Sequence, residues 1–135
     1  MYLCVMNDTN YDLLLQLASL ILPSEMLLYF NIVRIEEDTT MVGKDVIPTV
    51  HIYLDEADNR EHMEEYKELK PNGYTEPTTI ADFPLRKRKL LLHVRRRRWQ
   101  DSDGHNYLIK VMDLIAPGTS LSPELASFLK GGAIY

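Results

Sequence analysis

The sequence reads RKRKLLLHVRRRRWQDSDGH over residues 86–105, and this stretch decides the expected fold. Side chains alternate between the two faces of a β-strand, so Leu90, Leu92 and Val94 would share one apolar face. Charged residues flank this apolar centre on both sides. We therefore predict a half-buried strand at about 87–99.

A turn and further strands follow from the same reasoning. Asp103-Gly104 is a favoured hairpin dipeptide, and NYLIKVMDLI after it predicts a partner strand at about 105–115. TVHIYLDE alternates clearly and predicts a half-buried strand at about 49–56. NIVRIEED has a weaker strand rhythm, which we assign to about 31–37.

Helices are expected at both ends of the chain. Leucine-rich residues follow cap candidates near the amino terminus and, with PSEMLLYF after Pro23, predict two helices within about 9–30. The apolar face of the first helix is broad, which favours packing against another surface. Ser122-Pro123-Glu124 supplies a cap, a proline at the first helical position and an early acid, so a helix is expected at about 122–130.

These elements predict an α+β fold. Strands cluster in the middle of the chain, so we expect a small antiparallel sheet of about four strands with amino-terminal helices and a carboxy-terminal helix. The like-charge pairs of residues 57–76 weaken an isolated helix, so this segment is interpreted as a long acidic connection with one or two helical turns. A length of 135 residues is expected to form a single domain, residues 1–135.

Composition narrows the class of protein. A hydrophobic content of 45% with 26% charged residues is typical of a globular protein, and no apolar run reaches the roughly 18 residues of a membrane span. The opening MYLCVMNDTNYD does not resemble a secretory signal, so we expect a cytoplasmic protein that does not bind a membrane. Cys4 is the single cysteine, and it is interpreted as an ordinary thiol because it cannot form an internal disulfide or a cysteine-rich zinc site.

Charge is distributed very unevenly. The formal net charge is -5, yet residues 86–89 and 95–98 hold eight of the 15 lysines and arginines. Acids dominate residues 36–82 instead. Asymmetry of this size creates strong local fields that the net charge conceals.

The two basic runs have two interpretations. In the first they bind the phosphates of DNA, because guanidinium groups match phosphate geometry. In the second they neutralise acids of the same chain, such as Glu64, Glu65 or Glu68. Surface ion pairs stabilise a fold by only about 0–1 kcal/mol each, so we favour the first. The expected DNA contacts come from both runs and the aromatic residue after them: Lys87, Arg88, Lys89, Arg95, Arg96, Arg97, Arg98 and Trp99.

A series of spaced motifs runs from about Leu22 to Lys130: LPSEMLLYFNIV, VHIYLDE, IADFPLRKRKLLLHVRRRRW, a DG turn and LIAPGTSLSPELASFLK. Their order resembles the amino-terminal region proteins of ISAon-type insertion-sequence transposases. The resemblance implies a small separate or frameshift-joined reading frame beside a larger catalytic protein that carries the DNA-cleaving acids. The resemblance implies two partners, DNA at transposon ends and a catalytic transposase subunit. It leaves open whether the chain also forms a homo-oligomer.

The same stretch is similar to the start of ISL-type transposases, in which comparable segments border a cysteine-rich zinc module. Asp101 stands about where the first cysteine would fall, and no second cysteine pair exists. We therefore expect no zinc site here and a hairpin held by packing and backbone pairing alone.

Signals for metal binding and for catalysis are weaker in this sequence. His51, Asp55 and His93 could meet on facing strands as a metal set, but we favour ordinary surface histidines and expect no bound metal. No Gly-rich phosphate loop, HExxH motif or nucleophile elbow occurs, so we expect no catalytic residue and no cofactor.

The function that we expect is therefore a non-catalytic, DNA-binding accessory or amino-terminal region of an insertion-sequence transposase. The alternative is a protein–protein interaction module that docks on the catalytic subunit without touching DNA.

Overall fold

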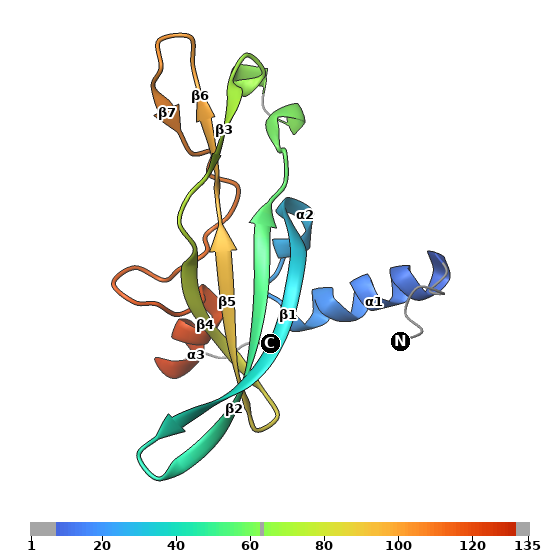
Figure 1. Ribbon diagram of the computed structural model, residues 1–135, viewed down its shortest axis with the longest axis vertical. Coiled ribbons are helices and arrows are strands. Elements are labelled where there is room, and N and C mark those ends of the chain that lie inside the picture. Colours follow the sequence, from blue (N-terminus) through green and yellow to red (C-terminus); the bar gives the residue numbers. More distant parts are fainter. Residues whose placement is uncertain (1–7, 63, 132–135) are drawn as a thin grey trace.

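Two long central strands, β2 (Asp45–Glu56) and β5 (Arg88–Arg95), lie where alternation predicted strands. The computed structural model of the chain describes residues 8–62 and 64–131. β1 (Phe30–Val42) pairs with β2, and β4 (Thr78–Leu85) pairs with β5, both antiparallel, while β2 and β5 run parallel. The resulting four-stranded sheet has the order β1-β2-β5-β4 (Figure 1). The predicted α+β class is confirmed, with a sheet that is mixed rather than purely antiparallel.

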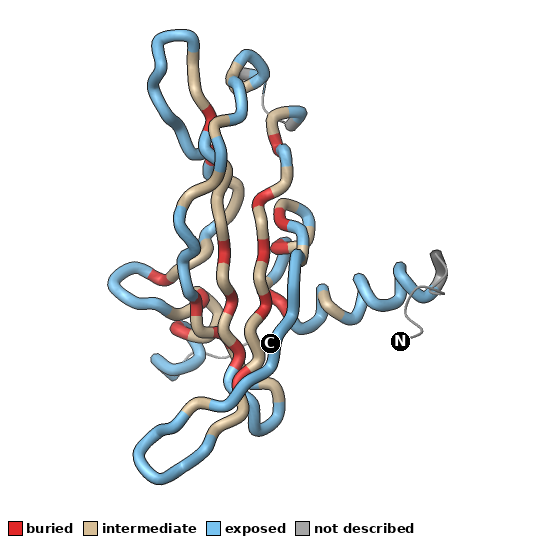
Figure 2. The backbone as a smooth tube through the Cα atoms, in the orientation of Figure 1, coloured by how far each residue is buried: buried red, intermediate tan, exposed pale blue. Residues whose placement is uncertain are grey.

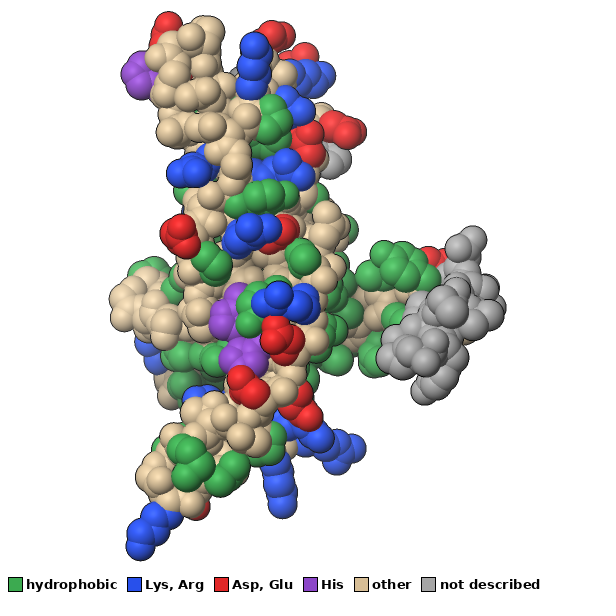
Figure 3. All heavy atoms as spheres, in the orientation of Figure 1, with side chains coloured by type: hydrophobic (Ala, Val, Ile, Leu, Met, Phe, Trp, Pro, Cys, Tyr) green, Lys and Arg blue, Asp and Glu red, His purple; other side chains and the backbone are tan. Residues whose placement is uncertain are grey.

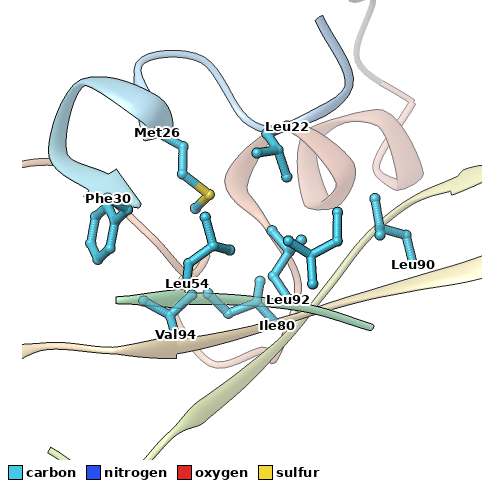
Figure 4. Packing of buried hydrophobic residues seen from close by; sticks show 9 residues of the cluster. Leu22, Met26, Phe30, Leu54, Ile80, Leu90, Leu92 and Val94 are labelled. Carbon is cyan, nitrogen blue, oxygen red and sulfur yellow. The ribbon is translucent and has the colours of Figure 1, made fainter. Parts of the chain in front are cut away.

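The core lies on one face of this sheet. Strand residues supply Leu54, Leu92 and Val94, and α2 (Met26–Tyr29) covers them with Met26 (Figure 4). The buried positions alternate along the two central strands, as Figure 2 shows. Burial of apolar side chains on one face is what fixes strand register, because a slip of one residue would expose them.

α1 (Asp8–Ile21) projects away from the sheet (Figure 1). Most of its leucines are exposed, and Leu20 keeps 82% of its surface. The expected packing of its apolar face is therefore not present among the residues that the structure describes. Leu22, just after the helix, does reach the core.

A second sheet has the order β3-β6-β7, built from β3 (Lys70–Tyr74), β6 (Arg97–Gln100) and β7 (Asn106–Tyr107). The single strand predicted at 87–99 is thus divided at Arg96 into β5 and β6, which belong to different sheets. At this point the Arg96 carbonyl accepts from the Thr75 amide, and the Arg96 amide donates to Thr75 Oγ1. Arg96 therefore bonds to the connection between β3 and β4.

The prediction of a strand at 105–115 is wrong except at Asn106 and Tyr107, which form β7. The rest of that segment has no regular structure, yet Val111, Met112, Leu114 and Ile115 pack against the core. Its apolar residues indicated burial correctly, and burial does not require a strand. The acidic connection at 57–76 contains two short turns, η2 (Arg60–His62) and η3 (Glu64–Tyr66), and then β3.

No strand was predicted at β4, because proline is disfavoured inside strands and Pro84 falls within this segment. α3 (Pro123–Leu129) follows the prediction, and Ser122 Oγ accepts a hydrogen bond from the Leu125 amide as its cap. Ser122 also donates from its amide to the Ala81 carbonyl, which attaches this helix to the edge of β4. Within the described ranges, no helix has the length and apolar character needed to cross a membrane.

Candidate nucleic-acid interface

The first basic run forms the turn between β4 and β5. Leu85 and Arg88 are register partners, so Arg86 and Lys87 occupy the tip. Arg86 has φ of 58°, a left-handed conformation that glycine adopts far more easily. Arg86, Lys87, Arg88 and Lys89 are all exposed, and basic side chains project at this end of the molecule (Figure 3).

Only one cation of this turn is paired in the described part of the chain. Arg88 Nε donates to Glu37 Oε2 at 2.6 Å, and both side chains are about half exposed. Arg86, Lys87 and Lys89 make no ion pair with any described residue. Their charges therefore face solvent.

The second basic run is mostly engaged within the chain. Arg95 makes a bidentate pair with Asp55, through Nε to Oδ1 at 2.7 Å and Nη2 to Oδ2 at 2.6 Å. The parallel register places these two residues side by side. Hydrogen bonding to Asp55 raises the pKa of Arg95 further, and the Tyr74 ring lies 4.5 Å from the guanidinium.

Arg96 points to the core side, where it meets Glu56. Arg96 Nε lies 3.0 Å from Glu56 Oε1, and Nη2 donates to the Ile109 carbonyl. Glu56 is 1% exposed, and its Oε2 has no hydrogen-bond partner among the described residues. This ion pair joins the end of the first sheet to the segment after β7.

Arg97 and Trp99 continue this internal network. The Arg97 amide donates to Glu56 Oε1, and Arg97 Nε donates to the Glu56 carbonyl at 2.8 Å. Trp99 is 1% exposed, and the Arg60 guanidinium lies 4.5 Å from its ring. The indole is a buried side chain, so the expected DNA contact by Trp99 has no free ring face in this conformation.

Arg98 differs from its neighbours because it is exposed. A Cβ built on Gly73 would lie 3.6 Å from Arg98 Nη2, so the side chain runs over that glycine. No ion pair involves Arg98 in residues 8–62 and 64–131. The structure thus divides the predicted set into free cations at the β4–β5 turn and at Arg98, and paired arginines between them.

The second interpretation of the basic runs is therefore correct in part, with different partners. Asp55, Glu56 and Glu37 neutralise arginines, whereas Glu64 pairs with Lys67. The sequence did not reveal these partners, because they depend on strand register. Arg86 was in the basic run but not among the expected contacts; the structure places it at the tip of the β4–β5 turn, which was not predicted.

The sequence left His51, Asp55 and His93 as a possible metal set, over which we favoured ordinary surface histidines, and the structure brings only part of this set together. His51 and His93 meet, with 2.8 Å between His51 Nδ1 and His93 Nε2. Asp55 is held by Arg95 instead, and Asp38 Oδ1 lies 3.0 Å from His51 Nε2. Burial, followed by the charge of His51, lowers the pKa of His93.

Asp101 holds the hairpin loop that follows β6. Its Oδ1 accepts from the amides of Asp103 and His105, and its Oδ2 accepts from the Tyr107 hydroxyl. These hydrogen bonds lower the pKa of Asp101. Asp101, Asp103 and His105 lie close enough together to contact one ion. Both Asp101 oxygens, however, already accept hydrogen bonds from residues of the loop. A side chain therefore supports the hairpin in addition to packing and backbone pairing.

In comparisons with protein-family models, with curated proteins and with solved structures, the chain has no match.

Proposed function

We propose that this chain is a non-catalytic DNA-binding accessory region of an insertion-sequence transposase. The observation that carries the proposal is the β4–β5 turn, where Arg86, Lys87 and Lys89 are exposed and unpaired within the described chain. Cations of this kind bind phosphates and release counterions, which gives affinity for DNA. The order of motifs that resembles ISAon-type proteins supports the transposase context.

Arg86 adds a second argument. A left-handed backbone costs a residue with a Cβ roughly 1–2 kcal/mol relative to the right-handed form, and glycine escapes that cost. A turn selected for stability alone would favour glycine at this position. The presence of arginine there is consistent with selection for its positive charge rather than for stability.

Arg98 extends the proposed surface along the strand direction. Arg98 lies nine positions after Lys89, and nine steps at the usual strand rise span at most about 30 Å. One turn of B-DNA measures about 34 Å, so the two basic ends could reach phosphates about one helical turn apart. Arg95, Arg96 and Arg97 then serve as positioning residues, because their pairs with Asp55 and Glu56 hold the strands that carry both ends.

The test is fluorescence anisotropy with the terminal inverted repeat of the element and a scrambled duplex, each titrated at several salt concentrations. The double variant Lys87→Ala/Lys89→Ala should weaken binding to both duplexes and reduce the salt slope by about 0.9 per lost phosphate contact. The control Lys44→Ala/Lys130→Ala removes the same charge at exposed positions elsewhere and should change little. Equal losses of DNA affinity in the two variants would mean that only the total charge of the chain matters, which would contradict a specific role for the turn. Absence of DNA binding by the native chain at low salt would contradict the whole proposal.

Arg86→Gly separates binding from folding. The substitution relieves the left-handed strain, so the free energy of unfolding should be kept or raised while DNA affinity falls. Unchanged affinity would remove the turn from the mechanism.

A second candidate function is docking on a catalytic transposase subunit without DNA contact. It is favoured by the exposed apolar face of α1 and by a groove of about 1070 Å³ that α1, α2 and β1 line, with Leu14, Leu17 and Leu28 among its walls. Exposed apolar surface of this kind commonly marks a protein interface. Co-purification with the catalytic subunit after nuclease treatment, lost in Leu14→Glu/Leu17→Glu, would support it.

A further inference from the structure

β1 leaves one edge of the first sheet open. In the order β1-β2-β5-β4, β1 pairs with β2 on one side and with no described strand on the other. The opposite edge of the sheet is protected, because Ala81 of β4 forms a bridge with Leu121 and accepts from the Ser122 amide. An open edge strand presents unpaired backbone N–H and C=O groups, which pair readily with a strand of another chain. β1 is therefore the edge at which this sheet can be extended.

Apolar side chains accompany the open edge. Val33 and Ile35 are both more than half exposed, although they lie inside a strand. Ile35 is the register partner of the buried Ile52, so it points to the core face of the sheet. It also lines the groove between α1, α2 and β1, together with Leu14 and Leu28. The exposed apolar surface thus continues from the strand edge to the two helices.

α1 extends past β1 on the open side of the sheet (Figure 1). The helix and Ile35 line the same groove, so α1 lies on the core side of the sheet. Its groove face carries Leu14 and Leu17, which are about half exposed. The sheet ends at β1, so these leucines have no further strand of their own chain to cover. A sheet that continued from the edge of β1 would bring its core face against them.

The charges of β1 are complementary to those of a second, antiparallel β1. Charged side chains on an edge strand commonly deter pairing between chains. Here Arg34 and Glu36 flank Ile35 and point to the face opposite the core. In an antiparallel pair of β1 strands centred on Ile35, Arg34 of one copy lies opposite Glu36 of the other, and symmetry forms the same pair again. Opposite charges that face each other across two strands stabilise the pairing, and like charges destabilise it.

We propose that two copies of this chain form a two-fold dimer, in which their β1 strands pair antiparallel about Ile35 and each α1 covers the core face of the partner's β1. One surface patch then serves both copies, as a two-fold interface requires. Arg34 and Glu36 are about half exposed and lie 2.6 Å apart within one chain, so both are accessible to the second strand.

The exposed apolar surface has the size that a dimer needs. A stable interface buries about 800 Å² of each partner, of which roughly 60% is apolar. A half-exposed leucine has about 60 Å² of apolar surface left to bury. The leucines of α1 and α2, with Val33 and Ile35, supply this apolar share.

The proposed interface contains neither the β4–β5 turn nor Arg98, so it does not depend on the proposed DNA contact. It does use the groove that the second candidate function gives to a catalytic subunit. A second copy of the chain and a catalytic subunit are therefore alternative occupants of one surface, and the oligomeric state of the purified chain distinguishes them.

The experiment is sedimentation equilibrium of the full chain over a range of concentrations. The native chain should have twice the mass of one chain at high concentration and approach the single mass on dilution. Arg34→Glu and Glu36→Arg should each raise the dissociation constant at least about 10-fold, because each places like charges opposite one another at two positions. The double variant Arg34→Glu/Glu36→Arg restores opposite charges at both positions and should associate like the native chain.

A mixture of the two single variants tests the pairing itself. In a mixed dimer, both acids of one chain face both bases of the other. Arg34→Glu protein with a fluorescent label should therefore bind Glu36→Arg protein at concentrations where neither variant associates with itself. Failure of the mixture and of the double variant to associate would overturn the pairing about Ile35.

Substitutions on α1 test the second half of the interface. Leu14→Glu, on the groove face, should weaken association at least about 10-fold, with far-UV circular dichroism to show that the variant folds. Leu20→Ser is the matched control and should leave association unchanged, because Leu20 is exposed on the same helix but outside the groove. The dimer is overturned if the native chain is monomeric at every concentration, or if Leu20→Ser weakens association as much as Leu14→Glu. A monomeric chain that captures the catalytic subunit through Leu14 would assign the groove to that subunit instead.

Discussion

At the scale of single residues, Glu56 is the acid on which the second basic run depends. It is buried and accepts from Arg96 Nε and the Arg97 amide. Removing one partner of a buried ion pair leaves the other charge unpaired, which typically costs about 3–5 kcal/mol. Glu56→Ala should therefore lower the free energy of unfolding by about that amount, as measured by urea denaturation.

Glu37 provides the comparison for Glu56. Its pair with Arg88 is exposed, so Glu37→Ala should change stability by only about 0–1 kcal/mol. Glu56→Gln keeps one acceptor oxygen and should fall between the two. Similar losses for Glu37→Ala and Glu56→Ala would mean that burial does not decide the strength of these pairs.

Asp82 makes stability depend on pH. It is 6% exposed, and burial raises its pKa even though the Ser122 hydroxyl donates to it at 2.7 Å. A raised pKa in the folded state favours the neutral form, so this contribution is fully present below the unfolded pKa near 3.8 and is lost as pH rises through the folded pKa. Unfolding measured across acid to neutral pH should show this loss.

Asp82→Asn should abolish that loss of stability with rising pH, because the amide does not ionise. Asp113→Asn, at an exposed acid paired with Lys110, should leave the profile unchanged. A native-like slope in Asp82→Asn would assign the pH dependence to another group.

At the scale of elements, α1 and α2 should respond very differently to substitution. Leu20 on α1 is 82% exposed, whereas Met26 on α2 is 1% exposed within the core cluster. Met26→Ala should cost about 2–5 kcal/mol, as buried large-to-small changes do. Leu20→Ser should change the free energy of unfolding by less than about 0.5 kcal/mol.

The sensitivity of Leu20→Ser to protein concentration is the critical control. A substantial loss of stability at high concentration only would indicate that α1 is covered by another copy of the chain. A substantial loss at every concentration would contradict the projecting position of the helix.

Elements with strong local signals were predictable from the sequence. Alternation identified β2 and β5, and Ser122-Pro123 identified the start of α3. β4 was missed because proline is disfavoured inside strands, whereas Pro84 lies near the end of β4, where it is tolerated. No local pattern in the sequence indicates that this segment pairs with β5. The candidate site was predictable only as a basic run, because the parallel register that pairs Asp55 with Arg95 is a property of the whole sheet.

At the scale of the whole molecule, the two sheets are joined at Arg96. Trp99 is the single tryptophan and reports on the second sheet, while far-UV circular dichroism reports on both. In the native chain the two unfolding transitions should coincide, because β5 runs into β6 and Glu56 bonds both Arg96 and Arg97. In Glu56→Ala the fluorescence transition should move to lower urea than the circular dichroism transition. Coincident transitions in that variant would show that Glu56 does not couple the sheets.

The parallel pairing of β2 with β5 has a consequence for the order in which the chain folds. The β1–β2 hairpin is local and can form as soon as its residues are available, but the free edge of β2 has no partner strand until β5 arrives from beyond the acidic connection. Closing a loop of that length carries an entropic cost that must be met before the contacts on the core face form. Pairing between distant segments slows folding, so the step that completes the core waits for residues 88–95, and the basic turn is ordered in the same event.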